Sequence, residues 1–409
     1  MMGWLTKRYL GVSTLTWALS FGAILLVSIT RAASGTQDIT SIDTFTAAIE
    51  AAMPILCAGL GGLWAERAGV VNIGLEGQML LGTWGAAYFN YNFGAWAGLA
   101  GGLLLGALGG LLHAVATVTF KIDHIVSGVA LNIIALGAID FLSQAIFSKY
   151  QYGGPKQLDG LAALPTVHVP LLSGWMSSLS NQHIFLISDV AGFIGACVTA
   201  LSLMTVIIAA LVVVTAYVLW RTRFGLRLRS VGENPAAAES LGVNVYRYKY
   251  VAVIISGALA GMGGAFLCMV SSSGFVVNQT GGRGYIGLAA MIFGNWRPLP
   301  TAGAALLFGY TDALHLRSPD SVHALLLLVG LGLLLFAVVR FLKGARRAAF
   351  ALAVAGAAFL AWFGLASTVP PEFSGMTPYI VTLLVLSLAS QRLRPPAADG
   401  QPYQKGSVT

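Results

Sequence analysis

The sequence has little charge. Only 9% of its 409 residues are Asp, Glu, Lys or Arg, whereas about a quarter of the residues of a typical soluble domain are charged. The mean hydropathy is +0.79, and apolar runs of about 18 residues or more recur from Leu10 to Leu388. Each run can cross a hydrocarbon core of about 30 Å as a helix. The sequence therefore excludes a water-soluble domain and predicts a chain that lies within a bilayer.

Cysteine is also scarce. Cys57, Cys197 and Cys268 lie far apart inside apolar runs, without the CxxC spacing of a redox or zinc site, and we expect them to be packing residues. The six histidines are scattered over different segments, and the sequence contains no HExxH or GxSxG motif. We therefore expect neither a bound metal nor enzymatic catalysis.

The sequence lacks a nucleotide-binding loop. A P-loop reads GxxxxGK followed by Ser or Thr, because its amides and lysine hold phosphates while the hydroxyl reaches magnesium. No lysine of this chain is followed by Ser or Thr. If nucleotide drives this protein, another chain must bind it, and we expect this chain to hold no cofactor.

The apolar runs predict an all-α fold, a polytopic transmembrane helical bundle of about 10–12 helices that includes broken or re-entrant segments. We expect a single transmembrane domain over residues 1–409. The expected helices are 10–31, 44–64, 69–90, 94–119, 125–147, 189–220, 251–273, 285–296, 299–314, 322–341, 347–366 and 376–391. The pair 285–296 and 299–314 is short and divided by the segment 295–298, so a re-entrant hairpin is an alternative to two full spans.

The positive charge is unevenly distributed between the predicted loops. If the N-terminus is cytoplasmic and the loops alternate, 18 of the 23 Lys and Arg fall on the cytoplasmic side, which is the positive-inside asymmetry. The net charge of +8 therefore indicates topology, and we expect no basic stretch to be interleaved with the exposed aromatic residues that stacking on nucleic-acid bases would need. This places the loop 148–188 outside, and the loop 221–250, the tail 392–409 and both termini in the cytoplasm.

Glycines follow a four-residue spacing from Gly94 to Gly110, and Gly257 and Gly261 repeat it. Such stripes let helix backbones approach closely in lipid. We favour this packing role over a direct role in lining a pore.

The cytoplasmic loop 221–250 contains the signals of a short helix of about two turns. Asn234 can cap it, Pro235 suits its first turn, and Gly242 can adopt the left-handed conformation that ends it. So short a helix is marginal in water by itself, so we expect it to dock either on the ends of its own chain's helices or on a partner subunit.

The segment 232–242 resembles the coupling segment of ABC importer permeases, because Ala237-Ala238-x3-Gly242 is similar to the Ala-Ala-x3-Gly core of their cytoplasmic signature. The Ile-x-Leu-Pro continuation is missing, as is common in the branch for branched-chain amino acids, ribose and nucleosides. The stretches 65–79 and 282–296, with the tail 400–403, are similar to the nucleoside (basic membrane protein-linked) permeases of that branch.

This resemblance implies the permease subunit of a bacterial plasma-membrane importer that translocates a small polar solute, a nucleoside in the most similar branch. The expected partners are an ATP-binding subunit that holds ATP and Mg²⁺, a second permease copy or sister permease, and an external lipid-anchored solute-binding protein. The residues that it assigns to coupling with the ATPase are Gly232, Glu233, Asn234, Pro235, Ala237, Ala238, Glu239 and Gly242.

The stretch 65–79 also has a physical interpretation. Glu66 and Arg67 fall at the cytoplasmic rim, where we expect a solvated pair of opposite charges. The glycines that follow loosen the next helix, so Asn72, Glu76 and Gln78 would supply polar groups where broken backbone lines a cavity. We assign these three residues to the translocation path, with structural hydrogen bonding between helices as the competing interpretation.

Two other classes of function stay open. An ion-coupled secondary transporter would use a carboxylate such as Glu76 or Asp140 and would work without an ATPase. A membrane scaffold would move no solute.

Between Leu316 and Pro370 the chain carries an additional helix pair, 322–341 and 347–366. The resembled family does not lead us to expect this pair. Its possible roles are lipid-facing packing, regulation and partner binding.

Overall fold

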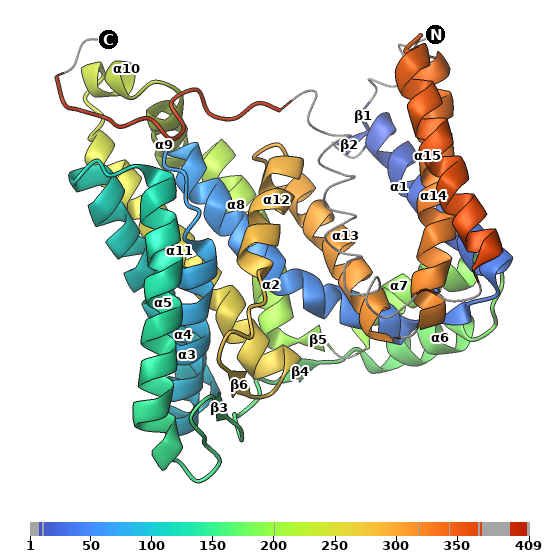
Figure 1. Ribbon diagram of the computed structural model, residues 1–409, viewed down its shortest axis with the longest axis horizontal. Coiled ribbons are helices and arrows are strands. Elements are labelled where there is room, and N and C mark those ends of the chain that lie inside the picture. Colours follow the sequence, from blue (N-terminus) through green and yellow to red (C-terminus); the bar gives the residue numbers. More distant parts are fainter. Residues whose placement is uncertain are drawn as a thin grey trace. The chain divides into compact units, whose positions relative to one another are not determined.

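The structure, a computed structural model, describes residues 8–9, 12–199, 201–317, 319–342, 344–366, 369 and 393–406 (Figure 1). Contacts divide the chain into two compact units. The larger unit comprises residues 49–166, 202–309 and 380–409, and the smaller unit comprises residues 1–48, 167–201 and 310–379. The two units are described separately, and the single permease domain expected over residues 1–409 stays a prediction.

The larger unit is built around three helices that pack on one another, α3, α4 and α11, with α5 against α3 (Figure 1). Its helices are α2 (Ile42–Arg67, which begins in the smaller unit), α3 (Leu75–Phe93), α4 (Ala95–Ala114), α5 (His124–Ile146), α8 (Leu203–Arg221), α9 (Arg223–Glu233), α10 (Pro235–Ser240), α11 (Val245–Phe266), α12 (Arg283–Phe293) and α13 (Pro298–Arg317, which ends in the smaller unit). The π-turns η2 (Val115–Thr119) and η4 (Leu267–Ser271) extend α4 and α11, and η3 (Phe147–Lys149) follows α5. The strands β3 (Gln157–Leu158) and β6 (Phe275–Val276) pair antiparallel, with Leu158 opposite Phe275.

The smaller unit contains α1 (Thr14–Ser34), η1 (Gln37–Thr40), α6 (Pro170–Ser180), α7 (Ile187–Val198), α14 (Pro319–Leu342) and α15 (Arg346–Leu365). Strand β1 (Arg8–Tyr9) pairs with β2 (Val12–Ser13), and β4 (Thr166–Val167) and β5 (Leu201–Ser202) stand where the chain passes between the units. A buried ion pair of 2.7 Å between Arg31 and Asp189 fixes α1 to α7, and Gln37 accepts a further hydrogen bond of 2.7 Å from the same guanidinium.

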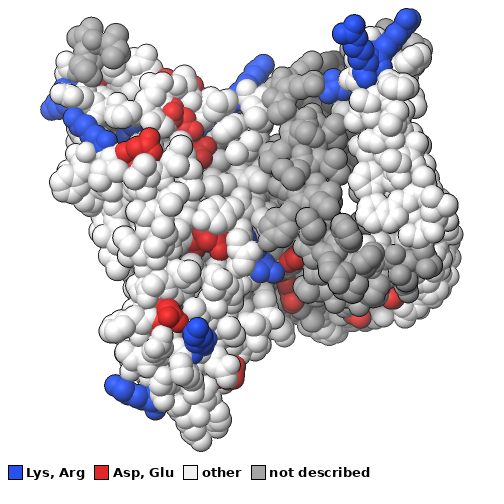
Figure 2. Space-filling view, in the orientation of Figure 1, with Lys and Arg blue, Asp and Glu red and all other residues white. Residues whose placement is uncertain are grey.

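Seven helices of the described residues are long and apolar enough to cross a membrane: Ile42–Arg67, Ala95–Thr119, His124–Lys149, Leu203–Arg221, Val245–Ser271, His323–Leu342 and Arg346–Leu365. Among the described residues on the face in Figure 2, acidic and basic side chains are few, as lipid contact requires. The prediction of an all-α, polytopic membrane protein is confirmed. The side of the membrane on which each loop lies stays a prediction from the charge pattern.

The glycine stripe packs helices. A Cβ atom at Gly106 would come within 2.3 Å of the Gly257 carbonyl oxygen, and one at Gly261 within 2.3 Å of the Gly102 oxygen. Both distances are too short for any side chain, so α4 and α11 touch backbone to backbone. Gly94 does not share this role, because it forms the turn between α3 and α4 with nothing near its missing side chain.

The prediction of a single helix over 189–220 is wrong. The chain instead forms α7, which ends at Val198, and α8, which begins at Leu203 after the strand β5. The Ser202 hydroxyl accepts a hydrogen bond of 3.3 Å from the Met204 amide and starts the second helix. The prediction is wrong because Ser202 lies within a mostly apolar run, which by itself predicts one helix. The loop 148–188 is also not wholly irregular, because α6 lies within it.

The expected division between 285–296 and 299–314 is present. Helix α12 has 11 residues, about 16 Å at 1.5 Å per residue, and cannot cross a bilayer alone. The additional pair is present as α14 and α15, which pack closely at Gly330 and Gly356. The helix expected over 376–391 lies outside the described residues.

Candidate coupling and translocation site

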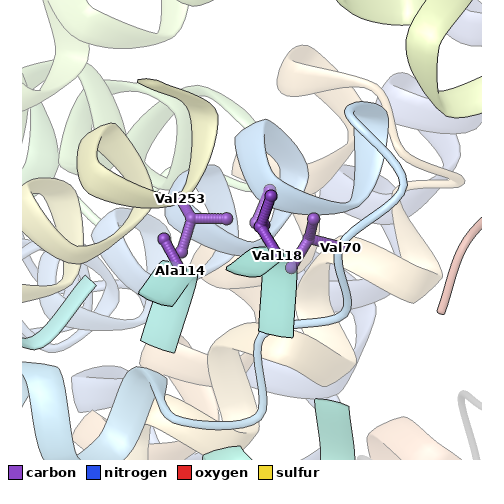
Figure 3. Close-up of a cluster of buried hydrophobic side chains, with 5 residues drawn as sticks. Val70, Ala114, Val118 and Val253 are labelled. Carbon is purple, nitrogen blue, oxygen red and sulfur yellow. The ribbon is translucent and has the colours of Figure 1, made fainter. Parts of the chain in front are cut away.

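The connection between α2 and α3, residues 68–74, is irregular backbone inside the larger unit. Helix α2 ends where Gly69 adopts a φ of +77°, which lets the Val70 amide reach back 3.1 Å to the Ala65 carbonyl. Val70 then points into a buried apolar cluster with Ala114, Val118 and Val253 (Figure 3). The connection is therefore packed, and it cannot be a solvated loop.

Side chains of other helices satisfy the backbone of this α2–α3 connection. His124 Nδ1 accepts from the Val71 amide at 3.2 Å, and His113 Nε2 donates to the Val71 carbonyl at 3.0 Å. The Lys249 ammonium donates to the Gly69 carbonyl at 3.3 Å. Broken backbone away from water needs such partners, so α4, α5 and α11 all hold this connection in place.

Asn72 and Gln78, two of the predicted path residues, bond to each other. The Asn72 amide donates to Gln78 Oε1 at 2.9 Å and the Gln78 amide donates to Asn72 Oδ1 at 3.2 Å. Asn72 also donates to the Ser256 hydroxyl at 2.8 Å, and all three side chains are fully buried. In this conformation the pair joins α3 to α11, as the competing interpretation of structural hydrogen bonding expects, and its assignment to the path stays a prediction.

Glu76, the third predicted path residue, caps the N-terminus of α12. Its Oε1 accepts from the Thr280 hydroxyl at 2.6 Å and the Gly282 amide at 2.9 Å, while Oε2 accepts from the Gly284 amide at 2.7 Å. The carboxylate thus occupies the positive end of a helix dipole. Gly284 permits this approach, because a Cβ there would lie 2.6 Å from Glu76 Oε2.

Asn132 of α5 forms hydrogen bonds with α3, with the α2–α3 connection and with α12. It accepts from the Gly77 amide at 2.7 Å and donates to the Ile73 carbonyl at 3.1 Å and the Tyr285 hydroxyl at 2.9 Å. The sequence interpretation missed Asn132, whose only signal is an amide side chain within an apolar helix.

Glu66 and Arg67 do not form the solvated pair that we expected. Glu66 is buried and accepts from the Trp296 indole N–H at 2.5 Å. Arg67 donates to the Trp296 carbonyl through Nε at 3.1 Å and Nη2 at 2.8 Å, and its Nη1 lies 3.7 Å from Glu233. That part of the expectation is wrong, because the turn after α12 and the end of α9 cover both side chains. The two residues still end a helix on the side that carries α9 and α10 (Figure 1).

The short helix of the loop 221–250 is confirmed as α10. The Asn234 side chain accepts from the Ala237 amide at 2.9 Å, Pro235 begins the helix, and Gly242 follows it with a φ of +80°. Ala238 is buried against Val231 and other apolar residues of its own chain. The sequence interpretation did not predict the preceding helix α9, which Thr222 caps by accepting from the Gly225 amide at 3.1 Å.

The coupling residues and the rim residues meet directly. A Cβ at Gly232 would lie 2.2 Å from the Arg67 carbonyl oxygen, so α9 rests against the end of α2. The described residues therefore bring the predicted coupling segment, the rim pair and the α2–α3 connection into one packed group. They contain no group of three or more His, Cys, Asp or Glu side chains that could hold a metal ion.

The chain matches a known protein family over most of its length. Residues 44–339 match the family described as "Branched-chain amino acid transport system / permease component". The match ends within α14. No solved structure matches the chain.

Relatives match most of the chain, among them the following three. The nucleoside ABC transporter permease protein NupC of Lactococcus lactis subsp. cremoris is 36% identical over 359 residues, which cover 86% of this chain and 93% of NupC. The guanosine ABC transporter permease protein NupQ of Bacillus subtilis is 33% identical over 368 residues, 87% and 94% of the two chains. The putative glucose ABC transporter permease protein TsgC13 of Haloferax volcanii is 31% identical over 370 residues, 88% and 96% of the two chains. The chain therefore belongs to the branched-chain amino acid transport system permease family and is a multi-pass transport subunit of the plasma membrane that leaves ATP hydrolysis to a separate subunit.

Proposed function

We propose that this chain is the permease subunit of an ABC importer that carries nucleosides, and that α9 and α10 couple it to the ATP-binding subunit. Two relatives named for nucleoside or guanosine transport, each matched over more than nine-tenths of its length, support the substrate class. The contact of Gly232 with the end of α2 carries the coupling part of the proposal, because it links α10 to the α2–α3 connection.

Helix α10 has the surface of a docking element. Ala238 faces its own chain, whereas Ala237, Ser240 and Gly242 are exposed. Leu241 is 84% exposed at the end of the helix, on the side that the charge pattern assigns to water. A large apolar side chain in that position favours a protein partner.

The importer that we propose also contains partner chains. The ATP-binding subunit holds ATP and Mg²⁺ and receives α10. An external lipid-anchored binding protein delivers the nucleoside, and a second permease copy or a sister permease forms the other half of the path. These assignments come from the resemblance of the segments 65–79, 232–242 and 282–296 to nucleoside permeases of ABC importers.

The translocation path opens in this proposal by movement of the α2–α3 connection. Asn72, Glu76 and Gln78 all have partners within the chain, so they reach a solute only when α3, α11 and α12 shift relative to one another. Displacement of α9 by the ATP-binding subunit would bear on the end of α2, from which the connection begins.

The test replaces Leu241 with Asp. Burial of a leucine side chain in an interface contributes about 1.5–3 kcal/mol, so the variant should bind the ATP-binding subunit about 10- to 100-fold more weakly. Co-purification in mild detergent and nucleoside-stimulated ATP hydrolysis in proteoliposomes measure this loss. Leu171→Asp is the matched control, because Leu171 is 92% exposed on α6, a different surface helix.

The control should keep both activities. If Leu241→Asp binds the ATP-binding subunit as tightly as the unchanged chain, α10 is not the docking helix. Nucleoside uptake by this chain alone in liposomes would instead support an ion-coupled carrier.

A further inference from the structure

The C-terminal segment 393–406 runs along the coupling region as extended chain and turns. The Ala398 amide donates to the Gly232 carbonyl at 2.9 Å, and the Ala397 amide donates to the Glu233 carboxylate at 3.2 Å. Ahead of these residues, the Arg394 amide donates to the Asn295 side chain at 2.8 Å. The tail segment therefore contacts α9 and the turn after α12 at the same time.

Tyr403 anchors the far end of the tail segment. It is buried in an apolar cluster with Val231, Ala238 and Val245, which belong to α9, α10 and α11. Its ring lies 5.3 Å from the ring of Tyr246. The buried face of α10 is thus completed by a residue more than 160 positions further along the chain.

Asp399 anchors the near end. Its carboxyl faces the carboxyl of Glu66, which accepts the hydrogen bond from the Trp296 indole. Lys249 and Arg67 face it with positive charge, and the exposed Glu233 bonds the neighbouring Ala397 amide. Burial raises the pKa of Asp399 to about 6.

The tail segment also closes over the α2–α3 connection. The carbonyl oxygen of Ala398 lies 3.1 Å from where a Cβ of Gly69 would stand, and Gly400 lies against Val71. The segment therefore reaches the coupling helices and the connection together.

Without the tail segment, fewer contacts would join α9 to α2. The described residues would keep the approach of Gly232 to Arg67, the Arg67 and Arg229 side chains over the Trp220 ring, and the Arg67–Glu233 pair, whose charges are 3.7 Å apart and whose Glu233 side chain is 54% exposed. Exposed ion pairs of this kind contribute little to stability. We propose that residues 393–406 act as a strap that transmits displacement of α9 and α10 to the α2–α3 connection, with Tyr403 and Asp399 as its positioning residues. This inference rests on the proposed function.

The test uses the complete importer in proteoliposomes, with its ATP-binding subunit and binding protein, and inosine as the transported probe. The readout is the number of inosine molecules imported per ATP hydrolysed. Tyr403→Ala should lower this ratio about fivefold or more, a typical coupling effect, while binding of the ATP-binding subunit changes less than about twofold. Tyr403→Phe should restore the ratio, because it keeps the ring that fills the cluster.

Lys405→Gln is the matched control. It changes one charge of the same tail segment at an exposed position and should leave the ratio unchanged. An unchanged ratio in Tyr403→Ala would overturn the proposal. If the unchanged chain and Lys405→Gln also import no inosine with ATP, the proposed function fails instead, and the two failures are thereby distinguished.

Hydrogen exchange of the unchanged complex provides a second test that does not depend on a variant that folds. We expect the amides of 393–406 and of 68–74 to change their exchange together, by about tenfold or more, when a non-hydrolysable ATP analogue binds. A change confined to one of the two segments would contradict a strap that joins them.

Discussion

Replacement of Glu76 separates the two transport mechanisms that the sequence leaves open. In an ion-coupled carrier, Glu76 would take up and release a proton or bind sodium, and its neutralisation would abolish transport. In the structure this carboxylate is a cap, which accepts hydrogen bonds from Thr280, Gly282 and Gly284 at the start of α12. We therefore expect replacement of Glu76 to lower the stability of the folded chain, and not to abolish transport directly.

The size of the effect follows from the three donors. Glu76→Ala leaves two amides and one hydroxyl without this acceptor in a buried site, at about 1–3 kcal/mol each, so a loss of about 3–9 kcal/mol is expected. Glu76→Gln keeps the shape but removes the charge, and its amide group cannot accept from the donor that it then faces. Loss of a charged acceptor at a helix N-terminus costs about 1–3 kcal/mol.

The assay is the melting temperature of the detergent-purified chain, followed by ATP-driven inosine uptake of the fraction that remains folded. The expected order of melting temperature is unchanged chain, then Glu76→Gln, then Glu76→Ala. Thr280→Ala is the matched control, because it removes one donor and keeps the carboxylate. It should lower the melting temperature least of the three variants. Per folded molecule, Glu76→Gln should retain ATP-driven uptake.

Two results would refute this reasoning. An unchanged melting temperature in Glu76→Ala would show that the three hydrogen bonds do not hold α12. A Glu76→Gln protein with normal stability but no uptake, together with uptake by the unchanged chain in response to an ion gradient alone, would favour the secondary transporter.

Three further predictions concern the tail, the packing and the coupling helix. The docked Asp399 has a pKa of about 6 against an ordinary value of 3.8, so docking of the tail takes up a proton. The tail should therefore dock most strongly below about pH 4, and its docking constant should fall by about a hundredfold as the pH rises to about 6. Asp399→Asn should remove this pH dependence of docking, as measured by the hydrogen exchange of 393–406. Gly261→Ala should destabilise the chain by about 1–3 kcal/mol or prevent folding, as measured by its melting temperature, whereas Gly137→Ala, with open space at its Cβ, should not. Asn234→Ala should destabilise α10 by about 1 kcal/mol and increase its hydrogen exchange, while Asn234→Asp should not.

The sequence was sufficient for elements whose signals are local. Asn234, Pro235 and Gly242 act within one short stretch, and α10 forms as they predict. The glycine spacing similarly predicted close packing of helix backbones, because a four-residue spacing puts glycines on one helix face. That α4 and α11 are each other's partners is seen only in the structure.

The partners of the α2–α3 connection could not be predicted in the same way. His113, His124 and Lys249 bond to backbone atoms of residues 69–71, across separations of 42 to 180 residues. Sequence reasoning excluded the histidines as a metal site because they are scattered. It had no means of seeing that broken backbone elsewhere in the chain needs side-chain partners, since that need arises only after the helices pack.

The expected solvation of Glu66 and Arg67 failed for a related reason. A neighbouring pair of opposite charges at the end of a helix is usually cheap to solvate, and nothing local indicates burial. The cover comes from Trp296 and Asp399, which lie 229 residues or more along the chain. The tail 400–403 was noted only for its resemblance to a family, and its contact with α9, α10 and α11 was not foreseen.

The segments that carry the family resemblance are bonded to one another. Glu76 caps α12, Trp296 bonds Glu66, and Gly232 rests on Arg67, with the tail across the last contact. In the mechanism that we propose, a displacement of α9 and α10 moves the end of α2 and with it the α2–α3 connection, which contains Asn72 and leads to Gln78 in α3. The hydrogen bonds that hold this end in place, from Trp296 to Glu66 and between the connection and His113, His124 and Lys249, oppose the movement by about 1–3 kcal/mol for each bond that breaks.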